Sequence, residues 1–198
     1  VTGVQTCALP ISDRLSISNP DKPPFVIKEM QKLAYTLVLT SQSSSFIHAG
    51  SEFMRSKNGV ENSFESPDSI NAINWDLKSK HLDLFTYVKR LIQLKKEHSA
   101  FNLPTPAKQI RFYVDSTNGV IGYFLDATQT ADKWREVKVW FNPSAIPVSI
   151  QRPFTNDIPL FSSYLITKNN RFLRKPKKIN QKTKLILQPY SSLIIAEW

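Results

Sequence analysis

The hydrophobic pattern changes once along this chain, at Pro104 and Pro106, and that change limits the folds that the chain can adopt. Before the two prolines, apolar residues recur at the spacing of amphipathic helices. After them, short apolar runs alternate with turn residues, as they do in strands. Helices followed by a run of strands are typical of an α+β protein. The sequence therefore predicts two parts, residues 12–101 and residues 105–198.

The first part contains two predicted helices. Val26, Met30 and Leu33 lie four and three residues apart, and this spacing predicts an amphipathic helix over residues 26–40. A second helix is predicted over residues 80–98, with its lysines concentrated in the second half, where positive charge complements the helix dipole.

A long loop lies between these helices. Residues 46–49 are short and apolar enough for a buried strand, and about twenty-five residues of loop follow them as far as Trp75. Phe53, Phe64 and Ile70 lie within this loop, and such residues favour an ordered segment. Helix, buried strand and long loop is the order of an α/β unit, which places binding residues where the loop leaves the strand.

The second part is predicted to be an antiparallel β-sandwich, because several short strands follow one another with turn signals between them. Asn118-Gly119 is a strong hairpin signal between the first two strands. The predicted strands are 109–114, 120–125, 137–141, 148–151, 164–166, 184–187 and 192–197.

The first eleven residues, VTGVQTCALPI, resemble the in-frame translation of a sequencing adapter. We interpret residues 1–11 as an artefact, so that the natural sequence begins near Ser12 as a fragment of a longer protein. The alternative is a short apolar N-terminal strand. Cys7, the only cysteine, lies in this segment, so the remainder can supply no thiolate for catalysis, disulfides or metal binding. No apolar run approaches the length of a membrane-spanning helix.

Few of the usual catalytic patterns occur. The three histidines do not have the spacing of a metal site. His48 either contacts a ligand or packs as a hydrogen-bonded histidine, and both interpretations remain open. The loop carboxylates Glu61, Glu65 and Asp68 could serve glycoside chemistry only where two of them converge. Glu52, next to the predicted strand, is expected to have a structural hydrogen-bonding role.

The chain is basic, with 26 lysines and arginines against 16 acids and a formal charge of +10. Much of the excess lies in residues 168–178, which invites a nucleic-acid interpretation because such runs release counterions on binding. The alternative, which we prefer, is a solvated loop between strands.

Short motifs across the loop resemble those of the α-amylase superfamily, and more narrowly those of type I pullulanases, which cut α-1,6 links in pullulan and branched α-glucans. Asp13-Arg14-Leu15 resembles the residues after the seventh barrel strand of that family. The most specific matches are His48-Ala49-Gly50, Glu52-Phe53, Arg55, Lys57, Asn62-Ser63-Phe64, Ser66-Pro67-Asp68, Ile70-Asn71 and Trp75.

This resemblance implies the C-terminal end of a (β/α)8 barrel, namely its last βα unit and the preceding helix, followed by the β-sandwich. The three catalytic carboxylates of the superfamily would all lie upstream of residue 12. The parent enzyme would be a retaining glycoside hydrolase, and this chain alone would be inactive. The apolar faces of residues 26–40 and 46–49 would be partly exposed, because their barrel neighbours would be absent.

The resemblance also implies that residues 62–71 line glucose-binding subsites. Asp68 is the first candidate contact, with Asn71 on the same turn and with Asn62 and Arg55 behind them. An ion pair with Glu52 that holds the loop is the alternative for Arg55. The expected partner is an α-glucan rather than nucleic acid. No cofactor or metal is expected in this chain, and calcium stays an option for the parent enzyme.

Two further alternatives remain. One is an isoamylase-like or glycogen-debranching enzyme of the same superfamily. The other is a carbohydrate-binding or structural β-sandwich, which requires an exposed aromatic platform. The candidate platform residues are Trp134, Trp140, Tyr164 and Tyr190.

Overall fold

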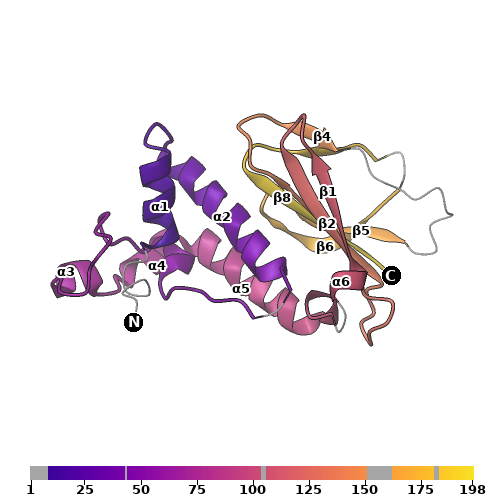
Figure 1. The fold of residues 1–198 in the computed structure, drawn as a ribbon, viewed down its shortest axis with the longest axis horizontal. Coiled ribbons are helices and arrows are strands. Elements are labelled where there is room, and N and C mark those ends of the chain that lie inside the picture. Colours follow the sequence, from indigo (N-terminus) through magenta and orange to yellow (C-terminus); the bar gives the residue numbers. More distant parts are fainter. Residues whose placement is uncertain (1–8, 43, 104–105, 151–161, 181–182) are drawn as a thin grey trace.

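The computed structural model describes residues 9–42, 44–103, 106–150, 162–180 and 183–198, and it places helices on one side and strands on the other (Figure 1). The longer helices are α1 (Ile11–Ser18), α2 (Pro24–Thr40) and α5 (Leu82–Glu97). The short ones are α3 (Asp68–Asn71), α4 (Asp76–Lys80), α6 (Pro106–Gln109) and the 3₁₀ helices η2 (Ser51–Phe53) and η3 (Ser99–Phe101).

The two predicted helices are confirmed as α2 and α5. Helix α2 begins at Pro24, whose missing N–H costs nothing in the first turn. Helix α1 was not predicted, because its eight residues carry no strong apolar face. It begins at Ile11, the last residue of the segment interpreted as an artefact. Residues 1–8, including Cys7, lie outside the described residues, so the alternative of an N-terminal strand there is not tested.

The strands form two antiparallel sheets, as predicted for the second part. The larger sheet has the order β1-β2-β3-β8-β5-β6, and the smaller one pairs β4 with β7. Between β1 and β2, Gly119 has a φ of +67°, and the amide of Asn118 donates to Asp115, which confirms the hairpin. The strands are β1 (Ile110–Asp115), β2 (Val120–Asp126), β3 (Glu136–Asn142), β4 (Val148–Ile150), β5 (Ser163–Lys168), β6 (Phe172–Ile179), β7 (Leu185–Leu187) and β8 (Ser191–Glu197).

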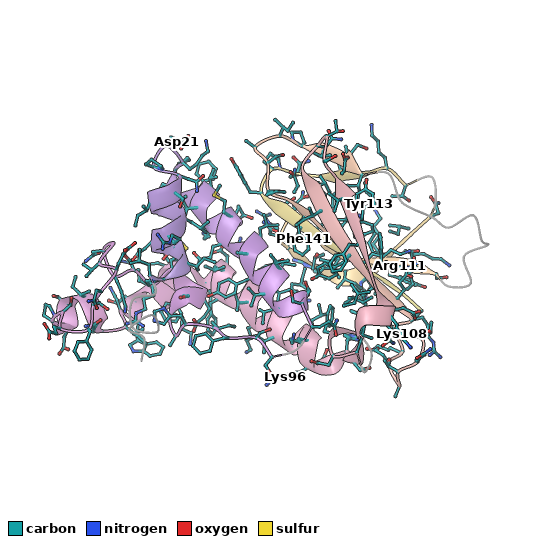
Figure 2. All side chains as sticks on the ribbon, in the orientation of Figure 1. Asp21, Lys96, Lys108, Arg111, Tyr113 and Phe141 are labelled. Atoms are coloured by element: carbon teal, nitrogen blue, oxygen red, sulfur yellow. The ribbon has the colours of Figure 1, made fainter. Side chains whose placement is uncertain are left out.

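Both faces of the larger sheet are buried at its central strands. Phe141 and Ile194 lie in a core shared with Leu39 of α2 and Leu91 of α5, and Figure 2 shows Phe141 between the sheet and the helices. On the opposite face, residues such as Trp140 pack in a second core with β4 and β7. The central strand β8 is buried along its whole length. The helices and the sheet therefore share one core.

Strand β6 corrects the prediction of a loop over residues 168–178. Its sequence, FLRKPKKI, contains Pro176 and several lysines, which are poor signals for a strand inside a sheet. At the edge of a sheet they are suitable, because charges and proline discourage pairing with another chain. Much of the basic run thus lies on an edge strand.

The prediction of a buried strand at residues 46–49 is wrong for the described structure. These residues form no strand, and Phe46 is 91% exposed. A strand requires a neighbour that accepts and donates its backbone hydrogen bonds, and no described segment pairs with this one. The expected exposure of apolar side chains is confirmed, since Leu37 and Val38 of α2 are also exposed.

A buried polar network joins the sheet to the helices. Asn170 follows β5, is 1% exposed and has a φ of +53°. Its amide nitrogen donates to the carbonyl oxygen of Tyr190 at 2.8 Å and to the Oε2 of Glu29 on α2 at 3.1 Å. Its oxygen accepts from the backbone N–H and hydroxyl of Ser192, both at 2.9 Å. One side chain therefore links β8, α2 and the turn between β5 and β6.

A second buried polar contact, between the end of α5 and the segment that joins β2 to β3, involves His98. His98 Nδ1 lies 3.0 Å from Asp132 Oδ1, and its ring stacks on Trp134 with centroids 3.3 Å apart. Burial by itself would raise the pKa of Asp132. Hydrogen bonds from His98 and from the backbone N–H groups of Trp134 and Ala100 outweigh burial, so the pKa lies below its ordinary value.

Replacing Asn170 tests the buried polar network between the sheet and the helices. Asn170→Ala should lower the free energy of unfolding by about 2–4 kcal/mol, because it leaves several buried groups without a partner. Asn169→Ala is the matched control, since Asn169 also has a positive φ but its buried Oδ1 has no hydrogen-bond partner. The control should cost about 1 kcal/mol, the scale of a left-handed conformation without asparagine. Equal losses in urea unfolding would contradict the network's role.

The contact between His98 and Asp132 predicts that the free energy of unfolding depends on pH. A lowered pKa in the folded state makes the charged Asp132 stabilising above its unfolded pKa of about 3.9. That contribution is lost as the pH falls through the lower folded pKa. The difference in unfolding free energy between the unmodified chain and Asp132→Asn should therefore shrink below about pH 4. Glu65→Gln, an exposed acid without a described partner, should show no such change, and a constant Asp132→Asn difference would exclude this effect.

Candidate functional site

Arg55 organises the loop between Phe46 and Trp75. Its guanidinium is largely buried, and Nη1 donates to the carbonyl oxygen of Ala49 at 3.1 Å. Nη2 donates to the carbonyl oxygen of Asn71, at the far end of the loop. Gly50 has a φ of +87°, and a Cβ there would lie 2.9 Å from the Arg55 Cδ. Only glycine allows the chain to pass this close to the arginine.

His48 packs against the same guanidinium. Its Nε2 lies 3.3 Å from Nη1 of Arg55 and accepts in the tautomer protonated at Nδ1. Burial, and then the charges of Arg55 and Lys57, lower the pKa of His48 below its ordinary value. The ring is therefore mostly uncharged at neutral pH. Its contact with Arg55 agrees with the packing interpretation of His48.

A second anchor comes from α1. The carboxylate of Asp13 accepts from the backbone N–H of Lys57 at 2.6 Å, and the hydroxyl of Ser12 donates to the carbonyl oxygen of Arg55 at 2.6 Å. Lys57 in turn donates through Nζ to Ser63 Oγ at 2.6 Å. Sequence reasoning did not assign these roles. The only signal was that Asp13 belongs to a motif that resembles the pullulanases.

The four predicted contact residues divide into two pairs. Arg55 and Asn71 are turned inward, and the Asn71 amide donates to the carbonyl oxygens of Ser63 at 2.7 Å and Ser66 at 2.8 Å. Asn62 and Asp68 are exposed, and their side chains form no hydrogen bond or ion pair within the described residues. Arg55 and Asn71 thus shape the loop, whereas Asn62 and Asp68 present unoccupied polar groups to solvent.

Glu52 departs from its expected role. Its Oε2 is buried without a hydrogen-bond partner, and neither the structural hydrogen bond nor the ion pair with Arg55 forms among the described residues. The carboxylate borders a cavity of about 330 Å³ between the loop and α5, lined mainly by apolar side chains such as Ile47, Phe85 and Ile92. A buried carboxylate oxygen without a donor is energetically costly.

A second apolar groove is lined in part by residues 46–48. It has a volume of about 430 Å³, and Ile11, Val38 and Phe46 are among its lining residues. Within the loop, Phe53 is buried and its ring centroid lies 5.7 Å from that of Trp75, while Phe64 remains 74% exposed.

The loop carboxylates show no paired arrangement. Glu61 forms an exposed ion pair with Arg14 at 3.4 Å, and no described contact joins two of the loop acids. Among the described residues, no three histidine, cysteine, aspartate or glutamate side chains are grouped as a metal site would need. In that same part of the chain, none of the helices has the length and apolar character that crossing a membrane requires.

The aromatic platform required by the carbohydrate-binding alternative is only partly available. Trp134 and Trp140 are buried. Tyr164 and Tyr190 are half-buried, and Tyr164 stacks on Trp198 with ring centroids 3.9 Å apart. Burial therefore excludes the two tryptophans as a platform, whereas the two tyrosines keep part of their surface exposed, so the criterion of complete burial is met for two of the four candidates.

Known proteins similar to this chain are pullulanases, although no family model matches it. The pullulanase of Bacillus subtilis (strain 168) is 36% identical over 149 residues, which cover 74% of this chain and 20% of that protein. The solved structure of pullulanase type I from the same strain, complexed with maltose, has a TM-score of 0.83 and 30% identity. The match covers 93% of this chain and 25% of the Bacillus subtilis chain.

A pullulanase from Paenibacillus barengoltzii, solved in complex with maltohexaose and alpha-cyclodextrin, has a TM-score of 0.79 and 29% identity. It covers 93% of this chain and 27% of its own length. The chain thus spans only about a fifth to a quarter of these proteins. By sequence and by fold alike, it is homologous to a part of the type I pullulanases, the family that the motifs between His48 and Trp75 resemble.

Proposed function

We propose that this chain is part of a debranching enzyme that hydrolyses α-1,6-glucosidic links in pullulan and branched α-glucans by a retaining mechanism. The observation that carries the proposal is the 36% identity to a pullulanase over three quarters of the chain. Similar structures were solved with maltose and maltohexaose, which are α-glucan oligosaccharides. The proposal places any calcium ion of the parent enzyme outside the described residues of this chain.

The chemistry of the proposed reaction requires two carboxyl groups close together, one as nucleophile and one as acid and base. We propose that these catalytic carboxylates lie upstream of this chain, as the resemblance to the pullulanases implies. In this proposal the chain contributes binding rather than bond cleavage.

The proposed contribution of the loop is a set of glucose contacts. Sugar hydroxyls both donate and accept, so an exposed carboxylate and an exposed amide suit them. Asp68 and Asn62 have these groups unoccupied, and Arg55 and Asn71 fix the backbone that carries them. We assign Asp68 and Asn62 to substrate contact and the other two to positioning.

We also propose that residues 12–101 close a (β/α)8 barrel with upstream segments. Ile47 lines two apolar grooves, of about 330 and 430 Å³, and we propose that upstream barrel segments fill them. The unpartnered Oε2 of Glu52 requires a donor, and an upstream segment could supply one.

Asp68 can be tested in a chimera in which this chain replaces the matching segment of the Bacillus subtilis pullulanase. Asp68→Ala should raise KM for pullulan about tenfold, the scale of one lost hydrogen bond to a charged group, and should change kcat much less. Glu65→Ala removes a neighbouring exposed carboxylate and should leave KM near the unmodified value. An unchanged KM for Asp68→Ala would contradict its assignment.

The isolated chain is expected to release no reducing sugar from pullulan, because it would lack the catalytic carboxylates. The same assay with the chimera is the positive control. Release by the purified 198-residue chain, above a preparation from cells without it, would overturn the proposal that the chain is inactive alone.

A further inference from the structure

A pocket of about 540 Å³ lies away from the loop, where α2, α5 and the turn between β5 and β6 meet. In Figure 1 these elements adjoin at the junction of the helices and the larger sheet, and α2 packs against both α5 and β8. Lys32 and Asn170 are buried and lie deep in the pocket. Phe25, Arg90 and Arg171 are exposed and form its rim.

The charges deep in the pocket cancel one another. Lys32 Nζ lies 2.8 Å from Glu29 Oε1 and 3.0 Å from Asp83 Oδ2, and Lys28 Nζ lies 3.0 Å from Asp83 Oδ1. Glu29 Oε2 accepts from Asn170. All four carboxylate oxygens therefore already have a donor within the protein, and two lysines balance two acids.

The rim is different, because its two guanidinium groups have no acidic partner among the described residues. Arg90 stacks over the ring of Phe172, with its Cζ 4.4 Å from the ring centroid, and this contact leaves the N–H edges of the guanidinium free. Arg171 directly follows Asn170, whose buried hydrogen bonds fix the turn. Arginine offers donors and no acceptor, so the rim presents two positive charges and mainly donors.

This donor pattern selects the kind of ligand. A neutral sugar needs acceptors as well as donors, and the carboxylate oxygens of this pocket already accept from Lys28, Lys32 and Asn170, so the free polar groups are mainly the arginine donors. A phosphate group has only acceptor oxygens at neutral pH when it is fully ionised, and its three free oxygens can meet two guanidinium groups at once. Phe25, which is 67% exposed, offers an apolar surface beside it.

We propose that this pocket binds a phosphate monoester, with its phosphate between Arg90 and Arg171 and its uncharged part against Phe25. We choose a sugar as the uncharged part, so that the ligand is a sugar phosphate, and this choice rests on the proposed function in α-glucan degradation. The arginine site itself does not depend on that function, since it is argued from charge and hydrogen bonding alone.

Binding can be measured by calorimetry on the full chain, with inorganic phosphate, glucose 6-phosphate and glucose as probes. Glucose 6-phosphate should bind more tightly than phosphate, and glucose should not bind detectably. Arg90→Gln and Arg171→Gln should each weaken both anions about tenfold, the scale of one charge-assisted hydrogen bond. Phe25→Ala should reduce glucose 6-phosphate binding to the level of phosphate.

Lys96→Gln is the matched control, because Lys96 is an exposed cation of α5 that does not line the pocket (Figure 2). It should bind both anions as the unmodified chain does. Equal weakening by Lys96→Gln would show attraction to the net charge of +10 and would overturn the site. Absence of anion binding, or equally tight binding of glucose, would overturn it as well.

Two features keep the result interpretable. Arg171 is an exposed turn residue, so Arg171→Gln gives an answer even where another variant does not fold, and circular dichroism checks each variant. The binding assay involves no hydrolysis. A chimera in which Asp68→Ala leaves KM unchanged would therefore count against the proposed function and would not affect the phosphate site. Absence of phosphate binding to the unmodified chain would overturn the phosphate site and would not affect the proposed function.

Discussion

The hydrogen bonds of Asn170 are the interaction on which the relation between sheet and helices depends. A polar side chain that is 1% exposed must have partners, and those of Asn170 come from β8, from α2 and from the turn before β8. Thr36 and Tyr87 extend this contact, because the Thr36 hydroxyl lies 2.7 Å from the Tyr87 hydroxyl and 3.1 Å from that of Ser192. Hydrophobic burial would allow α2 to slide along the sheet, whereas directional bonds hold it at one position.

The fixed position of α2 has consequences at both of its faces. Gln31 donates to the carbonyl oxygen of Ser51, so the start of the long loop is held by the same helix that the sheet holds. Toward the sheet, Lys32 and Glu29 complete the ion-pair network beneath Arg90 and Arg171. The loop and the pocket proposed to bind phosphate therefore share one support.

Sequence periodicity predicted most of the fold, because amphipathic helices and half-buried strands have distinct spacings. It did not predict β6, whose lysines and Pro176 are suitable only at a sheet edge, and sequence alone does not reveal which strand is outermost. It predicted a strand at 46–49 from apolar content, but a strand also needs a neighbour for its backbone, and none is described here. Local pattern thus predicts what an element could form, while pairing decides whether it forms.

The candidate site shows the same division between composition and context. Residue type could not separate Asn62 from Asn71, since both are asparagines in one loop. The structure separates them, because the Asn71 amide is used by Ser63 and Ser66 and the Asn62 amide is not. A polar group whose bonds are satisfied internally shapes a site, and one left free can meet a ligand. Glu52 is a third case, since its oxygen is buried and still has no donor. Such a group is costly unless it is satisfied, and for that reason Glu52 enters the proposal that an upstream segment packs on this part of the chain.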